Sequence, residues 1–516
     1  MIRRALGGII SPTTEELKAI GKQYHFEISD EELDYFSAVI EGFMPAYRKI
    51  EALPDPKPPV KYPRTPGYQP TADENPLNAW YWRTSIKGEP TGKLAGKTVA
   101  VKDTIALAGV PMMIGSAVME GFMPDYDATV VTRILDAGGE IVGKATCEDF
   151  CCSGSSQTSV PGPVRNPHNP AYSAGGSSSG SGAVVVAGDC DMALGGDQGG
   201  SIRIPAAQVG AVGLKPTWSL VPFTGIASVD ATIDHVGPMT RTVEDTALLL
   251  EAIAGYDPDD ARQSPGIKGE EYTKACTGEA QGLRIGILEE GFGWGDDSKD
   301  TDAAVREAAH AFERAGATVG QASVPMHRDG VDLWTALLID GFFVQLILLN
   351  GANYGGRGFY DTRAIDYMGR SRKTMADNFP AGVKLLTLHG HYMLEHYNGR
   401  YYAKSQNQRK LLTQSYDEAF KDFDILALPT LAPWGMAHEL SGDPTPSLEQ
   451  LIENSFSYHV NTCPTDLTGN PGISIPCAKI NGLPVGMMLL GRRWEDGTVI
   501  RAAHAFQELG LYHNSP

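Results

Sequence analysis

The sequence predicts an α/β fold, because strand patterns and helix patterns follow one another along the chain. The segment TVAVK, residues 98–102, is typical of a buried strand that ends at Lys102. Farther along, LRIGIL predicts a strand from Leu283, residues 301–315 predict a helix, and TVGQASV predicts another strand. Hydrophobic residues make up 42% of the 516 residues, which is enough for a sizeable core. A chain of this length fits two to four domains, or one large α/β domain with a lobe.

The first 53 residues are predicted to be helical. Thr13 and Ser29 each begin a capping box, with a glutamate three residues later. The apolar residues after Ser29 fall on one helical face: Leu33, Phe36, Ile40 and Phe43. Seven prolines between Pro54 and Pro70 then predict an extended connector.

Two glycine-rich loops are the most informative feature of the chain. GGSSSGSG begins at Gly175 and contains Ser177, and GGDQGGSIRIPA begins at Gly195 and contains Ser201. Glycine lets backbone approach a ligand closely, so each serine can be surrounded by N–H donors, as an oxyanion hole requires. A flexible linker is the alternative, but the apolar residues after the first loop indicate a packed core. A phosphate loop is disfavoured, because Ser181 stands where that motif has lysine.

Several segments around these loops resemble the amidase signature hydrolases. Together they cover most of residues 94–260 and 460–507, and they include LAGKTVAVKD, GEIVGKATCEDF, VGLKPTWSLVPFTG, IDHVGPMTRTVEDTALLL and DLTGNPGISIPCAKINGLPVGMMLLGRRWEDGTVIRAAHAF. Gln198, the long N-terminal extension and the segment NPLNAWYW are most similar to the enantioselective amidases of nitrile-degradation pathways within that family.

The resemblance implies an amidase-signature fold, which is a large mixed β-sheet covered by helices on both faces. We expect a helical extension and connector over residues 1–70 and a catalytic domain over residues 75–516. Roughly residues 275–430 would contribute a smaller lobe that shapes the substrate site. In similar enzymes such an extension contributes to a dimer interface, so a homodimer is expected. Packing of the helices on their own catalytic domain is the alternative.

The resemblance also implies a Ser–cisSer–Lys triad. Ser201 matches the nucleophile, Ser177 the bridging serine after a cis peptide bond from Gly176, and Lys102 the base. A serine hydroxyl needs an adjacent base, and a lysine is a base only when neutral, which requires a pKa below the usual value of about 10.4. The alternative, a surface lysine, fits poorly with the end of a buried strand.

Other residues are expected to support the triad. Asp197 and Arg203 flank the nucleophile and are expected to brace its loop rather than to touch substrate. Four consecutive backbone N–H groups would hold the oxyanion: those of Gln198, Gly199, Gly200 and Ser201. Four aromatic residues are candidate walls of the substrate pocket, although aromatic residues at helical spacing are also ordinary core residues: Phe150, Trp334, Phe342 and Phe343.

These observations predict an amidase that hydrolyses small aliphatic or aromatic carboxamides to a carboxylic acid and ammonia through an acyl-enzyme. One alternative is an aryl acylamidase or carbamate hydrolase that acts on N-substituted amides. Another is the glutaminase-type subunit of a tRNA-amidating complex. A catalytically silent binding protein is disfavoured, because all three residue types of the triad are present.

The net charge and the number of cysteines limit which binding partners and which cellular location are expected for the protein. The formal net charge of −19 disfavours nucleic acid and acidic membrane surfaces as partners. No apolar run approaches the roughly 20 residues of a membrane span, so a cytoplasmic location is expected. The seven cysteines, an odd number, indicate reduced thiols rather than a disulfide framework.

No metal and no cofactor is predicted. The three cysteines of CEDFCC, residues 147–152, lack a second ligand pair for zinc. A cysteine nucleophile with Glu148 and a lysine is the alternative use of this cluster. His389, His391 and His396 lie in a predicted helix, where the first two diverge by about 200° and cannot share an ion.

Overall fold

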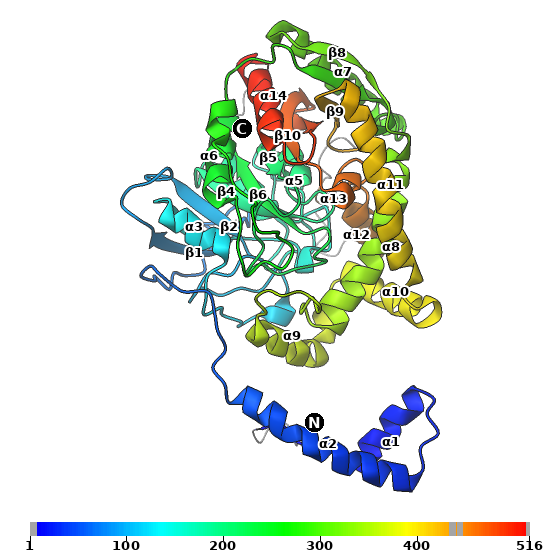
Figure 1. Cartoon of the computed structure of the whole chain (residues 1–516). Coiled ribbons are helices and arrows are strands. Elements are labelled where there is room, and N and C mark those ends of the chain that lie inside the picture. Colours follow the sequence, from blue (N-terminus) through cyan, green and yellow to red (C-terminus); the bar gives the residue numbers. More distant parts are fainter. Residues whose placement is uncertain (1–7, 433–439, 441–446, 512–516) are drawn as a thin grey trace. The chain divides into compact units, whose positions relative to one another are not determined.

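The computed structural model describes residues 8–432, 440 and 447–511, which divide into two compact units, Met1–Lys57 and Pro58–Pro516 (Figure 1). The first unit contains the helices α1 (Thr14–Gln23) and α2 (Asp30–Glu51). Both predicted capping boxes are present, in which a hydroxyl and a glutamate satisfy each other's backbone N–H groups.

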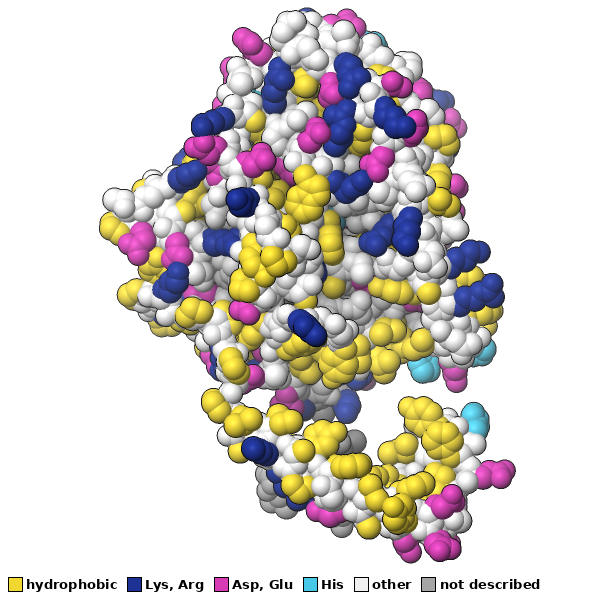
Figure 2. All heavy atoms as spheres, viewed as in Figure 1, with side chains coloured by type: hydrophobic (Ala, Val, Ile, Leu, Met, Phe, Trp, Pro, Cys, Tyr) yellow, Lys and Arg dark blue, Asp and Glu magenta, His cyan; other side chains and the backbone are white. Residues whose placement is uncertain are grey.

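Within the first unit, α1 leaves much of the apolar face of α2 uncovered. Leu33 is buried, whereas the side chains of Phe36 and Phe43 are 42% and 61% exposed. Figure 2 shows hydrophobic side chains gathered on these helices. Such a patch is more than the single exposed apolar residues that a monomer ordinarily carries.

One mixed sheet of eleven strands forms the centre of the second unit. The strand order is β1-β3-β2-β4-β6-β5-β10-β11-β9-β7-β8. The neighbours β3-β2-β4 and β9-β7-β8 are parallel, and the other pairs are antiparallel. The strands are β1 (Trp80–Lys87), β2 (Thr98–Lys102), β3 (Glu140–Ala145), β4 (Met192–Asp197), β5 (Val212–Lys215), β6 (His235–Thr240), β7 (Arg284–Leu288), β8 (Thr318–Ala322), β9 (Ile425–Pro429), β10 (Gly472–Ile480) and β11 (Leu483–Leu490).

Helices cover both faces of this sheet, as predicted. Successive side chains of a strand point to opposite faces. In β2, Val99 and Val101 join the core that includes α3 and α6, whereas Ala100 joins the core that includes α4 and α5. The helices of this unit are α3 (Thr129–Asp136), α4 (Ser179–Val186), α5 (Arg203–Val209), α6 (Val243–Ile253), α7 (Lys299–His310), α8 (Asp329–Gly341), α9 (Thr362–Thr374), α10 (Ala381–Tyr397), α11 (Arg400–Asp422), α12 (Leu448–Phe456), α13 (Pro464–Thr468) and α14 (Asp496–Glu508).

The region expected to form a lobe shares the central sheet. The predicted strand–helix–strand after residue 282 is present as β7, α7 and β8, and β7 pairs in parallel with β8 and β9. A 3-10 turn over Ala311–Ala315 ends the predicted helix, before Gly316 at φ 90°. Residues 275–430 thus add three strands and several helices to one end of the sheet, and a separate lobe stays a prediction.

One helical segment, Pro325–Leu348, is long and apolar enough to cross a membrane by length and composition, with a mean hydropathy of 1.7. It comprises α8 and a π-helical continuation, Phe342–Leu348. Three of its large side chains are packed in the protein core, since Trp334, Leu337 and Phe342 are each at least 94% buried. Of the apolar window in this segment, 44% is buried inside the protein.

Candidate active site

The predicted base and the nucleophile's loop meet at one edge of the sheet. Lys102 is the last residue of β2, and Asp197 is the last residue of β4. Because β2 and β4 are parallel neighbours, their carboxyl ends lie side by side. The first serine loop precedes α4, which packs on both strands. The topology therefore brings three distant segments of the chain together.

The buried lysine contacts the bridging serine directly. Lys102 is fully buried, and its Nζ donates to Ser177 Oγ at 2.7 Å and to the Gly196 carbonyl at 3.3 Å. The Gly176–Ser177 peptide bond is cis, as the resemblance implied. Lys102 and Ser177 thus form one hydrogen-bonded pair in the interior.

The predicted nucleophile lies on the neighbouring loop. Ser201 is 96% buried and precedes α5. Its carbonyl accepts from the Ser178 N–H at 3.2 Å, which ties the two serine loops together. Among the hydrogen bonds of the described residues, none joins the hydroxyls of Ser177 and Ser201. Catalytic hydrogen bonds often tighten only when substrate binds.

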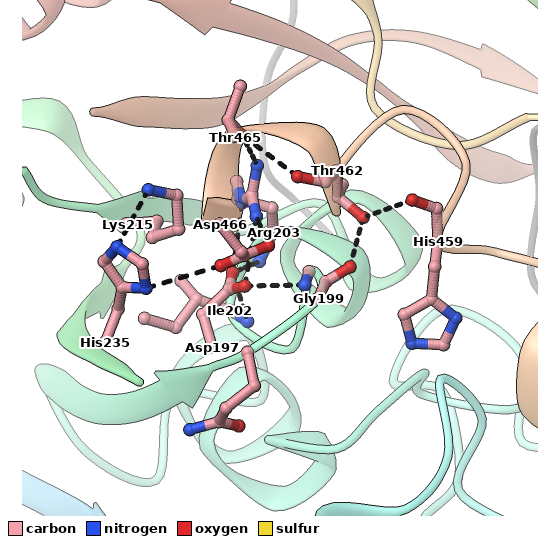
Figure 3. A network of polar contacts seen from close by, with 12 residues as sticks. Asp197, Gly199, Ile202, Arg203, Lys215, His235, His459, Thr462, Thr465 and Asp466 are labelled. Atoms are coloured by element: carbon pink, nitrogen blue, oxygen red, sulfur yellow. Dashed lines mark hydrogen bonds and ion pairs between the residues drawn. The ribbon is translucent and has the colours of Figure 1, made fainter. Parts of the chain in front are cut away.

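A buried ionic network holds the nucleophile's loop (Figure 3). Asp197 accepts from the N–H groups of Gly200 at 2.6 Å and Ile202 at 3.0 Å. Arg203 pairs with Asp197 at 3.0 Å and with Asp466 at 2.8 Å, and all three side chains are fully buried. Burial alone would raise the pKa of Asp197, but the Arg203 guanidinium outweighs burial and holds that pKa well below its usual range. The predicted bracing role of Asp197 and Arg203 matches this geometry.

One expected oxyanion donor points elsewhere. The Gly200 N–H is engaged by Asp197, so in this structure it is not directed at the substrate cavity. The backbone of Gly200 has φ 132°, and a Cβ there would lie 2.3 Å from Thr462 Oγ1. In this structure Gly200 therefore takes part in the bracing bond and the close packing rather than in the predicted oxyanion hole. The N–H groups of Gln198, Gly199 and Ser201 remain the predicted donors.

A narrow cavity of about 30 Å³ lies beside Ser201. Three of the predicted wall residues line it, Phe150, Trp334 and Phe342, together with Gln198 and Gly199. Trp334 Nε1 donates to the Gln198 carbonyl at 2.7 Å. Phe343 does not line this cavity; its ring packs edge-on against His391 of α10, with ring centres 5.4 Å apart. Successive residues of a helix point in different directions, so only one of this aromatic pair faces the site.

His459 was not identified from the sequence. It lines the cavity and stacks on Trp334 with ring centres 5.1 Å apart. Burial lowers its pKa to about 4, so the ring is neutral near neutral pH. His459 Nδ1 and Gln198 Oε1 are both buried without a hydrogen-bond partner. No motif marks the loop that carries His459, and only the fold places it against Trp334.

The cysteine cluster also lies at the site. Cys151 lines the cavity and interacts with Lys102 and Ser177, and a hydrogen bond from Cys147 together with the lysine lowers the pKa of its thiol. The Glu148 carboxylate accepts hydrogen bonds from Thr158 and Ser159, and among the described residues no hydrogen bond joins it to a thiol of the cluster. This geometry does not favour the alternative Cys–Glu–Lys site, which requires the carboxylate beside the thiol.

In the described part of the chain, one group of side chains has the spacing of metal ligands, and it lies outside the catalytic cavity. It consists of Glu244, His504 and Glu508. Both ring nitrogens of His504 are engaged, Nδ1 by the Gly278 N–H at 2.8 Å and Nε2 by Glu244 at 3.0 Å. Of the predicted helical histidines, His391 faces Glu395, and His396 Nδ1 donates to the Tyr392 carbonyl within α10.

Known proteins similar to this chain have the same fold and amide chemistry. A model of the Amidase family matches residues 69–500. An enantioselective amidase of Rhodococcus rhodochrous is 40% identical over 99% of this chain and 98% of its own length. A glutamyl-tRNA(Gln) amidotransferase subunit of Methanosarcina acetivorans is 37% identical over 82% of this chain and 86% of its own.

A solved structure extends the similarity to three dimensions. The crystal structure of a bacterial aryl acylamidase of the amidase signature family superposes with a TM-score of 0.70 at 25% identity, covering 85% of this chain and 91% of that chain. The family match spans most of the second unit, including β2, β4 and both serine loops. The chain belongs to the amidase signature family and is a hydrolase acting on amide C–N bonds.

Proposed function

We propose that the protein hydrolyses small aliphatic or aromatic carboxamides to a carboxylic acid and ammonia, with Lys102, Ser177 and Ser201 as its triad. The observation that carries this proposal is the buried Lys102–Ser177 hydrogen bond of 2.7 Å, beside the loop of Ser201. The 40% identity to an enantioselective amidase along nearly the whole chain supports it.

The reaction proceeds in two stages. Lys102 Nζ takes the Ser177 proton while Ser177 takes the Ser201 proton, and Ser201 Oγ attacks the amide carbonyl. The backbone N–H groups of Gln198, Gly199 and Ser201 hold the oxyanion, and each such donor typically contributes about 3 kcal/mol. Lys102 returns its proton through Ser177 to the leaving ammonia. Water then hydrolyses the acyl-enzyme by the same relay in reverse.

A primary carboxamide fits the polar groups of the cavity. Gln198 Oε1 is a buried acceptor without a partner, and the amide nitrogen of such a substrate carries two N–H donors. Because an unsatisfied buried polar atom costs about 1–3 kcal/mol, substrate binding gains by satisfying this acceptor.

The test is ammonia release from propionamide, benzamide, 2-phenylpropionamide and glutamine. Acetanilide is assayed for aniline in parallel, and Ser201→Ala is the control. We expect turnover of the simple amides and loss of at least 10³-fold in the variant, the order that nucleophile removal costs. Equal turnover by Ser201→Ala would overturn the assignment of the nucleophile.

Two other outcomes identify the alternatives. Glutamine as the sole substrate would indicate the glutaminase-type component of a tRNA-amidating complex, in line with the amidotransferase relatives. Aniline release without ammonia release would indicate an aryl acylamidase, the activity of one similar solved structure.

We further propose a cytoplasmic homodimer that buries the apolar face of α2. Phe36 and Phe43 are exposed on this face, and all seven cysteines are free, as in a reducing compartment. Light scattering on the purified protein should give twice the chain mass of 55.3 kDa. A Phe36→Asp/Phe43→Asp variant should give a monomer, and a dimer that survives this change would exclude the face.

A further inference from the structure

A second cavity lies near the catalytic cavity and is much larger, at about 460 Å³ against about 30 Å³. Small-molecule sites typically measure about 300–1,000 Å³. A cavity of about 30 Å³ holds only a water molecule or two. The larger cavity therefore has the size of a ligand site, whereas the catalytic cavity as it stands does not admit a bulky acyl group.

Three connections show that the two cavities are neighbours. Val229 lines the small cavity, and the preceding residue, Ser228, lines the large one. Phe342 lines the small cavity, and Leu346, one turn further along the π-helical segment, lines the large one. The Phe150 N–H donates at 3.0 Å to the carbonyl of Ile114, which lines the large cavity.

The wall between the cavities includes an unusual helical segment. The π-helix over Phe342–Leu348 continues α8 and contributes to both cavities. A π-helix is rare, and its short occurrences are often found at functional sites. Phe342 lines the small cavity and Leu346 the large one, so this segment lies between the two cavities.

The interior of the large cavity suits an apolar group that carries a hydrogen-bonding end. Its apolar lining includes flexible methionines and aromatic rings: Met112, Met119, Phe122, Phe359 and Met368. Thr224 and Asn353 also line it, and Thr224 Oγ1 and Asn353 Oδ1 are buried without a partner. Thr224 is 94% buried, so its hydroxyl has little access to solvent.

The charged side chains that line the large cavity disfavour the binding of anionic ligands. Four carboxyl groups line the cavity, those of Asp234, Asp259, Asp260 and Asp361, against one guanidinium, that of Arg262. Arg262 is already paired with Asp260 at 2.6 Å. An added carboxylate would therefore meet repulsion without a free cation, whereas an ammonium or hydroxyl group would meet acceptors.

We propose that the large cavity is the acyl-chain compartment of the active site, and that it accepts extended arylalkyl or aminoalkyl carboxamides but excludes those ending in a carboxylate. The inference rests on the proposed function, because the carboxamide of such a substrate must reach Ser201. The chain passes Phe342, and its far end lies among the methionines and aromatic rings, with Thr224 and Asn353 as polar partners.

The test compares a long and a short substrate in variants that fill or open the large cavity. The measured quantity is kcat/KM for 6-phenylhexanamide divided by kcat/KM for benzamide. Ala364 lies on α9 and lines the large cavity, so Ala364→Trp should lower this ratio about tenfold or more. Lys373→Trp, at an exposed position of the same helix, is the matched control and should leave the ratio unchanged. Phe342→Ala should raise the ratio by removing the wall.

Charge selectivity gives an independent measurement on the unmodified enzyme. 7-Aminoheptanamide should be hydrolysed with a kcat/KM about tenfold or more above that of the monoamide of heptanedioic acid. If Ala364→Trp does not fold, Ala261→Trp, from another segment of the lining, provides the filled cavity.

The outcomes separate this inference from the proposed function. A ratio that is the same in the filled, opened and unmodified enzymes would overturn the inference while benzamide hydrolysis still supported the amidase. Preference for the anionic substrate would overturn the assigned charge selectivity. Failure to hydrolyse any of these amides would overturn the proposed function, and the acyl-chain compartment with it.

Discussion

The loop of Ser201 and the aromatic wall line the same cavity but are held in place by different forces. Lys102, Asp197 and Arg203 are fully buried and are fixed by hydrogen bonds and ion pairs at the ends of two parallel strands. Phe342 and its neighbours lie on α8 and the π-helical segment, where apolar packing predominates. Hydrogen bonds and ion pairs depend on direction, so they fix the positions of the loop residues closely. Apolar packing tolerates substitutions by apolar side chains of similar volume.

Because of this difference, we expect the loop residues to determine whether the reaction occurs and the wall residues to determine which substrates bind. Replacing a buried charged side chain leaves its partners unpaired in a low-dielectric interior. The loss of stability is large, and it affects every segment that the network joins. Replacing a wall residue changes the shape of a cavity and leaves the loops intact. We therefore expect substitutions in the loops to abolish turnover, and substitutions in the wall to change which amides are accepted.

The largest effect is expected from the base. Lys102→Ala removes the partner of Ser177 and should lower kcat by about 10³-fold or more, since proton transfer contributes typically 10²–10⁴. Ammonia release from benzamide is the measurement, and circular dichroism checks the fold. Turnover within tenfold of the unmodified enzyme would show that another group is the base.

The next largest effect is expected from the centre of the ionic network. Arg203→Met leaves Asp197 and Asp466 as unpaired buried carboxyls and should lower the free energy of unfolding by about 3–5 kcal/mol. Urea denaturation measures the change. The matched control is Arg493→Met, whose partner Asp417 is at the surface, with an expected loss below about 1 kcal/mol. Equal losses in the two variants would contradict the bracing role.

The free energy of unfolding should depend on pH through Glu148, a buried carboxyl group beside the first serine loop. Burial raises the pKa of Glu148 to about 7, so between pH 4.5 and 7 the folded state retains a proton that the unfolded state has released. Glu148 therefore makes the free energy of unfolding fall as pH rises through this window, by on the order of 3 kcal/mol in total. The glutamine in Glu148→Gln does not titrate. Between pH 4.5 and 7, the free energy of unfolding of this variant should therefore rise by that amount relative to that of the unmodified enzyme. This prediction would be contradicted if the free energies of unfolding of the variant and the unmodified enzyme differed by the same amount at pH 5 and at pH 8.

The smallest effect is expected from the wall. Trp334→Phe keeps an aromatic ring but removes the donor to the Gln198 carbonyl, and kcat/KM for benzamide should fall about tenfold. Phe343→Leu, outside the cavity, is the control and should change kcat/KM less than twofold. A larger loss in the control would mean that packing of this segment as a whole, rather than the Trp334 hydrogen bond, sets activity.

Local patterns were enough to predict much of the molecule. The capping boxes at Thr13 and Ser29, the strand ending at Lys102 and the strand–helix–strand from residue 283 depend on neighbouring residues, and all are present. The family and the mixed sheet were predicted from segments that resemble the amidase signature hydrolases. The cis bond before Ser177 followed from the same resemblance.

Contacts between distant segments could not be read from the chain. His459 reaches the site because its loop packs on α8, and Gly200 is turned towards Asp197 by a hydrogen bond within a network that extends to Asp466. Phe342 faces the cavity and Phe343 does not, because the helix was set by its packing against α10 and α11.

The sequence by itself determined the elements, the family and the residue types of the proposed triad, because these depend on local spacing and on motifs. Tertiary structure decided which side chains surround Ser201, which N–H groups are free for the oxyanion and where the larger cavity lies. Those features depend on segments hundreds of residues apart, whose relative positions are set by the packing of one core.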